Sequence, residues 1–192
     1  DSIEPFNQIF DFKKEIVNDD DINECDAIVI WGGTDIHPKS YGQTSHPKNQ
    51  TPMYASPSER DLIEWHMMRV AHEKKKMIIG VCRGGQYLCV YAGGSLYQDV
   101  DGHRCGHSIT TYDGKSFNAP AEHHQMMNLD QTKYDLLAWS TDFRATKYER
   151  QGAGSNLPGK HLELGEPEVV WFPDILLSLI HISEPTRLRR IS

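Results

Sequence analysis

The sequence predicts a three-layer α/β domain built on an open, mainly parallel β-sheet. Two continuous apolar runs, residues 27–31 and 77–81, have the length and composition of strands that are buried on both faces. The segment between them contains a helix-compatible stretch, and a second such stretch, residues 86–92, follows the second run. Strands that alternate with helices are typical of parallel sheets with helices on their faces.

Bulk composition narrows the class of protein. The chain has 192 residues, enough for one domain with a sizeable core, and a net charge of -7 argues against nucleic-acid binding. No apolar run is long enough to cross a membrane, and no signal-peptide pattern is present. The four cysteines form no Cys-x-x-Cys pair, so we expect a reduced, cytoplasmic setting.

Local signals place the remaining elements. We expect a helix over residues 2–17, a solvated acidic loop at 19–21, and a second helix that ends near Lys75. For this second helix, Ser56 is the predicted N-cap, Pro57 occupies the first helical position and Glu59 closes a capping box.

Further strands are expected in the second half of the chain. We expect a β-hairpin around Asp113-Gly114 and strands at residues 135–139 and 168–172. The adjacent Arg60 and Asp61 are interpreted first as a structural ion pair.

The organising stretch is Met77-Ile-Ile-Gly-Val-Cys-Arg-Gly-Gly-Gln86, which predicts a strand, a sharp turn at Cys82 and a helix. Gly80 and Gly84 flank the cysteine, and small residues are needed where such a turn brings strand and helix close together. The helix N-terminus would favour a thiolate. A buried structural cysteine is the alternative, but the flanking glycines favour a nucleophile.

These residues carry a family resemblance. Gly80-Val-Cys-Arg-Gly-Gly-Gln86, together with Gly93-Gly-Ser-Leu-Tyr-Gln-Asp99, resembles class I glutamine amidotransferases with a flavodoxin-like fold. Gly32-Gly-Thr-Asp-Ile-His-Pro38 is most similar to their peptidase C26 branch, which includes γ-glutamyl-γ-aminobutyrate hydrolases. The resemblance extends over residues 27–174.

The resemblance implies roles for particular residues. Cys82 would be the nucleophile, and the backbone N–H groups of Gly33 and Arg83 would form the oxyanion hole. Four further residues are expected at the substrate pocket: Gly32, Gln86, His124 and Gln125. The implied reaction is hydrolysis of a γ-glutamyl amide through a γ-glutamyl thioester, with no cofactor.

Both ends of the chain depart from the family pattern. A strand that precedes residues 2–17 in the family is missing, and residues 177–192 resemble a translated sequencing adapter. We therefore predict a domain over residues 1–176 and a non-native tail over 177–192. The family's His-x-Glu would follow the strand at 168–172; His181 and Glu184 have a different spacing and are not assigned this role. This chain is thus expected to show little or no turnover, although Cys82 would still be alkylated.

The histidine-rich middle of the chain raises the question of a metal. Four histidines are candidate ligands: His103, His107, His123 and His124. His37 lies near the glycine pair Gly32-Gly33. The spacing of the first two suits one face of a helix, whereas this region is predicted to be loop and strand. We therefore expect no metal.

Three functions remain open. The first is a stand-alone hydrolase of small γ-glutamyl amides, acting alone or as a homodimer. The second is a glutaminase that delivers ammonia to a synthetase partner, and the third is an inactive domain that only binds. The pair Arg60-Asp61 and the segment Leu96-Tyr-Gln-Asp99 favour the first over the second.

Overall fold

A computed structural model describes residues 15–51, 56–103, 106–142, 145–150, 165–173 and, for its backbone alone, the strand 177–180. The helices are α1 (Asp19–Glu24), the short 3₁₀ helix η2 (Pro38–Tyr41), α2 (Glu59–Glu73) and α3 (Arg83–Tyr91). The strands are β1 (Ala27–Ile30), β2 (Met77–Val81), β3 (Ser95–Tyr97), β4 (Asp99–Val100), β5 (His107–Thr111), β6 (Ser116–Ala119), β7 (Met126–Asn128), β8 (Asp135–Ser140), β9 (Tyr148–Glu149), β10 (Glu166–Phe172) and β11 (Leu177–Ile180).

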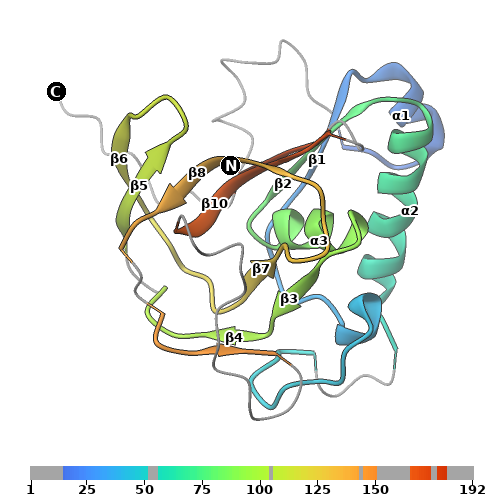
Figure 1. The fold of residues 1–192 in the computed structure, drawn as a ribbon. Coiled ribbons are helices and arrows are strands. Elements are labelled where there is room, and N and C mark those ends of the chain that lie inside the picture. Colours follow the sequence, from blue (N-terminus) through green and yellow to red (C-terminus); the bar gives the residue numbers. More distant parts are fainter. Residues whose placement is uncertain are drawn as a thin grey trace, which may run out of the picture.

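A seven-stranded sheet with the order β1-β2-β11-β10-β8-β5-β6 forms the centre of the molecule (Figure 1). The strands β1, β2 and β11 are parallel, with Ile30 beside Gly80 and Ile180 beside Val81. The pairings from β11 through β10, β8 and β5 to β6 are antiparallel. The described sheet is therefore mixed, and the predicted parallel pairing is confined to the three strands at one side. The hairpin β5–β6, expected from Asp113-Gly114, accounts for part of this difference.

The helices α2 and α3 pack side by side against the same face of β1 and β2 (Figure 1). Ile28 and Ile78 of the strands share one core cluster with Met68 of α2 and Leu88 of α3. Trp65 of α2 contacts the rings of Tyr87 and Tyr91, with centroids 5.8 and 5.0 Å apart. On the opposite face, Val29, Ile79 and Val81 form a smaller cluster with Cys82. The apolar composition of both strands is thus explained by contacts on both faces.

Two helix starts differ from the sequence predictions. The predicted acidic loop at residues 19–21 is the first turn of α1, capped by Asn18 in a reciprocal capping box with Asp21. Helix α2 is capped by Ser58, two residues later than predicted, and Asp61 closes its capping box. Three acidic residues in the first turn suit the positive end of α1, which favours helix over loop.

Several predictions on the chain ends fall on undescribed segments. Residues 15–17 of the predicted first helix are not helical, and the rest of that helix, residues 2–14, lies outside the described residues. Leu177–Ile180, the start of the predicted tail, forms β11 between β2 and β10. His181 and Glu184 lie outside the described residues. Among the described helices, none is both long and apolar enough to span a membrane.

Candidate active site

Cys82 lies at the carboxyl end of β2, where the chain turns directly into α3. Its backbone has φ 54° and ψ -114°, a strained conformation for a residue with a side chain. The turn is possible because Gly84 has no Cβ. A Cβ at this position would lie 1.9 Å from the carbonyl oxygen of Ile30. The predicted strand–turn–helix is therefore present, and it places a half-buried thiol at a helix N-terminus.

The glycine loop after β1 lies beside this thiol. A Cβ at Gly32 would be 3.7 Å from Cys82 Sγ, so the two residues are neighbours at the carboxyl edge of the parallel strands. Gly33 has φ +147°, and a Cβ there would lie 2.2 Å from Arg60 Nη1. The positive φ favours glycine at position 33, whereas a Cβ at position 32 would make only ordinary van der Waals contacts. A ligand site at this edge agrees with the general rule for open α/β sheets.

Arg60 holds the glycine loop from α2. Its Nη2 donates to the carbonyl oxygens of Trp31 (3.1 Å) and Gly32 (2.9 Å), and its Nε donates to Glu64 Oε1 (2.7 Å). The predicted ion pair between Arg60 and Asp61 is wrong, because successive helical residues point in different directions and each finds another partner. The sequence did not reveal the role of Arg60 as a clamp on the loop.

The side chain of Arg83 points away from the thiol into the protein. It is 2% exposed and forms hydrogen-bonded ion pairs with Asp61 and Glu64 of α2. Only its backbone N–H is then available to a substrate. As the first residue of α3, Arg83 has an N–H without an acceptor inside the helix, as an oxyanion donor requires.

Gln86 and Gln125 join α3 to the segment before β7. Gln86 Nε2 donates to the carbonyl oxygen of Gln125 (3.1 Å), and Gln125 Nε2 lies 3.4 Å from the carbonyl oxygen of Gln98. Both side chains are buried, at 4% and 1% exposure. The structure therefore gives each a packing contact, and their predicted contact with substrate stays a prediction.

His124 connects two acidic residues from distant segments. Its Nε2 lies 3.1 Å from Asp35 Oδ1 and its Nδ1 lies 3.5 Å from Asp99 Oδ1. The hydrogen bond with Asp35 raises the pKa of His124 above its usual value, and Asp99 adds to this effect. Asp99 also pairs with Lys48. The imidazolium thus holds the loop after β1, strand β4 and the segment before β7 together.

His37 has different surroundings from His103 and His123. His37 caps η2, with its Nδ1 accepting from the backbone N–H of Lys39 (3.2 Å). His103 and His123 instead come together with Glu168 of β10, and all three side chains are buried. Because this cluster combines three segments far apart in the sequence, spacing alone could not predict it.

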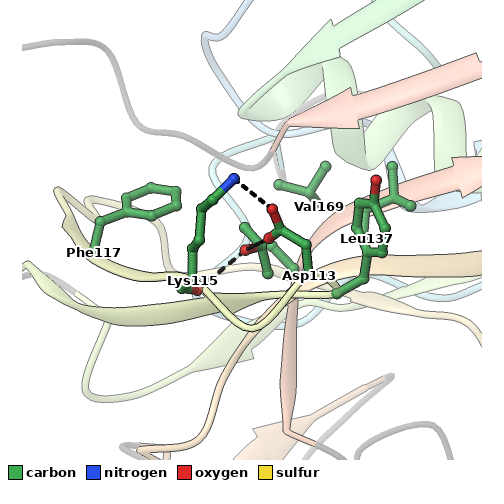
Figure 2. A pocket seen from close by; sticks show the side chains of 8 residues that line it. Asp113, Lys115, Phe117, Leu137 and Val169 are labelled. Atoms are coloured by element: carbon green, nitrogen blue, oxygen red, sulfur yellow. Dashed lines mark hydrogen bonds and ion pairs between the residues drawn. The ribbon is translucent and has the colours of Figure 1, made fainter.

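A surface pocket lies away from the elbow, the strand–turn–helix at Cys82. It lies between the β5–β6 hairpin and strands β8 and β10 (Figure 2). Lys115 and Asp113 form an ion pair at its edge, and Phe117, Leu137 and Val169 supply apolar walls. A second pocket is lined by residues 37–39 and 42–45, in and after η2. Cys82 lines neither pocket, but the second one is formed by the loop that continues from the glycine pair.

Comparison with solved structures gives the fold. A protein of Thermoplasma acidophilum, described as one component of a GMP synthase, superposes with a TM-score of 0.52 at 10% identity, covering 86% of this chain and 66% of that one. The protein SMU.1228c superposes with a TM-score of 0.51 at 16% identity, covering 88% and 61%. These similarities confirm the predicted α/β, flavodoxin-like fold class.

Comparison with curated sequences gives the family. A predicted glutamine amidotransferase of Mycobacterium tuberculosis is 31% identical over an alignment of 141 positions, and the match covers 63% of this chain and 44% of that protein. One of Schizosaccharomyces pombe is 43% identical over 81 residues, 42% and 30% of the two chains. The match thus spans less than half the length of these relatives. The family model described as Peptidase C26 matches residues 9–158. The chain therefore belongs to the peptidase C26 family, within the class I glutamine amidotransferase-like superfamily.

Proposed function

We propose that Cys82 hydrolyses a γ-glutamyl amide bond, in glutamine or a γ-glutamyl amine. The observation that carries this proposal is the thiol at the N-terminus of α3, beside the glycine loop at the carboxyl edge of β1 and β2. Family membership supports amide hydrolysis of the glutamine type. The thioester and the identity of the leaving amine are our inference from this geometry.

The proposed reaction has two halves. The thiolate of Cys82 attacks the side-chain amide carbon, and the backbone N–H groups of Gly33 and Arg83 bind the oxygen as it becomes negative. The C–N bond then breaks, the amine leaves with a proton, and a γ-glutamyl thioester remains on the sulfur. Water attacks the thioester, releasing the γ-carboxylate and restoring the thiol. A donor that transfers the protons is required, and histidine is the residue best suited to this at neutral pH.

A covalent label tests the nucleophile without requiring turnover. A diazoketone analogue of glutamine should modify Cys82, glutamine should protect it, and Cys82→Ala should abolish the modification, as read by peptide mass spectrometry. Cys89→Ala is the matched control and should leave labelling unchanged, because Cys89 is buried. Labelling that glutamine does not slow, or that persists in Cys82→Ala, would refute the proposal.

Turnover is a separate measurement. Because the His-x-Glu of the family is not matched, we expect this chain to release little or no ammonia from glutamine even when Cys82 is labelled. Glutamine hydrolysis that is lost in both Cys82→Ala and His181→Ala would show that the expectation is wrong and that His181 supplies the missing base. Hydrolysis that appears only after adding a synthetase would favour the ammonia-delivering alternative.

A further inference from the structure

A second cluster of ionisable side chains, built only from histidine and glutamate, lies at strands β5 and β10 of the seven-stranded sheet. Five residues form this cluster, and each is between 0% and 5% exposed: His103, His107, His123, Glu166 and Glu168. They come from the loop after β4, strand β5, the segment before β7 and strand β10. Three imidazoles and two carboxylates in the protein interior are costly unless each finds a partner.

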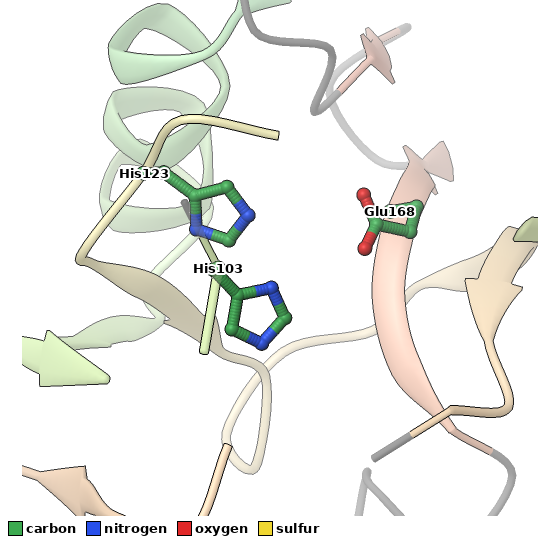
Figure 3. A group of neighbouring side chains, drawn as sticks. All are labelled: His103, His123 and Glu168. Carbon is green, nitrogen blue, oxygen red and sulfur yellow. The ribbon is translucent and has the colours of Figure 1, made fainter. Parts of the chain in front are cut away.

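Three of these residues converge on one point. His103, His123 and Glu168 each contribute one ligand atom, and these three atoms all lie within 4.8 Å of one another. The imidazoles of His103 and His123 pack with their centroids 4.6 Å apart. Figure 3 shows both rings on one side, with the carboxylate oxygens of Glu168 directed towards them from β10.

We propose that His103, His123 and Glu168 bind one divalent ion of the zinc type. Two imidazole nitrogens and one carboxylate oxygen form a donor set that suits Zn²⁺. In a tetrahedral site, ligands about 2.1 Å from the ion stand about 3.4 Å apart. The farthest pair of atoms in the cluster must therefore approach by at most about 1.4 Å on binding.

Outer contacts already orient each ligand. His123 Nδ1 lies 2.9 Å from the carbonyl oxygen of Gln125, which only accepts, so Nδ1 carries the proton and Nε2 is the ligand atom of the neutral ring. His107 Nε2 lies 2.6 Å from Glu168 Oε1 and leaves the other carboxylate oxygen for the ion. Partners of this kind fix the tautomer and orientation of metal ligands.

The surroundings of His103 are a second observation in favour of the proposed ion. Its Nε2 is 3.1 Å from Glu166 Oε2, an ion-pair distance without hydrogen-bond geometry, and its Nδ1 is buried and has no hydrogen-bond partner among the residues that the structure describes. A buried ring nitrogen in this situation is expensive, and an ion would satisfy it. Glu166 would then contact the ring nitrogen of His103 that does not bind the ion, as the carbonyl oxygen of Gln125 does for His123.

The ion would brace the predicted substrate-binding segment. The carbonyl oxygen of Gln125 accepts from His123 and also from Gln86 of α3. A bound ion would therefore fix residues 123–125 relative to both β10 and α3, the helix that follows Cys82. We infer a structural ion, since its three protein ligands are buried and join three segments of the chain; a water molecule would complete the tetrahedral coordination.

Untagged full chain, stripped with a strong chelator and then titrated with Zn²⁺ or Co²⁺ alone, provides the test. We expect one equivalent to bind, the Co²⁺ form to show the visible absorption of a tetrahedral site, and Zn²⁺ at a hundredfold excess over its dissociation constant to raise the Tm by about 5–10 °C. This readout is independent of Cys82, so it can fail while the proposed hydrolase activity stands, and the reverse.

Variants locate the ion. Glu168→Gln, which keeps the side-chain shape, and His123→Ala should each lose the one-equivalent binding; His107→Gln, which keeps all three ligands, should weaken it about 10–100-fold. His66→Ala is the matched control, because His66 is an exposed histidine on α2 and its loss should change nothing. Circular dichroism of the stripped variants reports their folding. Absence of binding in the wild type, or equal binding in folded Glu168→Gln, would overturn the proposal.

Discussion

At the scale of single residues, the elbow is determined by where side chains cannot fit. Gly84 faces the backbone of Ile30, and Gly80 faces the backbone of Gly84 and Gly85, so a Cβ at either position meets main-chain atoms. Main-chain atoms cannot move aside by changing rotamer, unlike the end of a flexible side chain. The conformation of Cys82 therefore depends on two residues that have no chemistry of their own.

Gly84→Ala should disrupt the elbow. Its Cβ would lie 1.9 Å from Ile30 O, so we expect a loss of at least about 3 kcal/mol in the free energy of unfolding and little labelling of Cys82 by the glutamine analogue. Gly114→Ala, at a positive φ in the β5–β6 hairpin with open space around it, is the control and should cost about 1 kcal/mol with normal labelling. Equal effects of the two substitutions in urea unfolding would contradict the explanation.

Cysteine reactivity should follow position. Burial raises the pKa of the Cys89 thiol well above its usual range, so Cys89 stays protonated at neutral pH. Cys82 is half-buried at a helix N-terminus. Iodoacetamide at neutral pH should therefore alkylate Cys82 in the folded protein and Cys89 only after unfolding. Peptide mapping over time decides this, and early modification of Cys89 would argue against the described packing.

At the scale of elements, α2 organises the site although it carries no nucleophile. Its first two turns place Arg60 on the glycine loop and place Asp61 and Glu64 on the side chain of Arg83. Asp61 also closes the capping box with Ser58. One helix thus fixes both the loop and the N-terminal turn of α3, the two elements that would supply the oxyanion donors.

Arg60→Ala should release the glycine loop. With its bonds to Trp31 O and Gly32 O lost, we expect labelling of Cys82 by the glutamine analogue to slow by at least about tenfold, because small misplacements of reacting groups are costly. Alkylation by iodoacetamide, which needs no oxyanion donor, should hardly change. Arg69→Ala removes a comparable arginine, paired with Glu73 on the same helix, and should leave both rates unaltered.

The accuracy of the sequence predictions depended on whether a signal was local. Residues 77–86 predicted strand, turn and helix because composition and glycine spacing act within one short segment. Ser56 and Ser58 are both acceptable caps by composition, and the choice of Ser58 depends on Asp61, whose buried partner Arg83 lies 22 residues away. Likewise, β11 and the His103–Glu168 cluster arise only when distant segments meet in the fold.

At the scale of the whole molecule, the carboxyl edge of the parallel strands is held by polar contacts between distant segments. Asp35 follows β1, Asp99 begins β4 and His124 precedes β7, and the imidazole of His124 contacts both carboxylates. Asp35 Oδ2 also accepts from the backbone N–H of Gln50 at 2.8 Å. The loops around the site are therefore joined by charged contacts in addition to the apolar core, which includes Ile36, Leu96 and Met127.

This arrangement predicts a nonadditive mutational effect. In His124→Gln the two carboxylates of Asp35 and Asp99 lose the cation between them, so we expect a loss of about 1–3 kcal/mol in the free energy of unfolding. Asp35→Asn alone should also destabilise, since His124 keeps only Asp99. The double variant should be more stable than the sum of the two losses implies, because removing both charges leaves less unpaired charge than removing either one. Urea unfolding of the four proteins measures the coupling energy, and strict additivity would mean that the contact does not link these segments in solution.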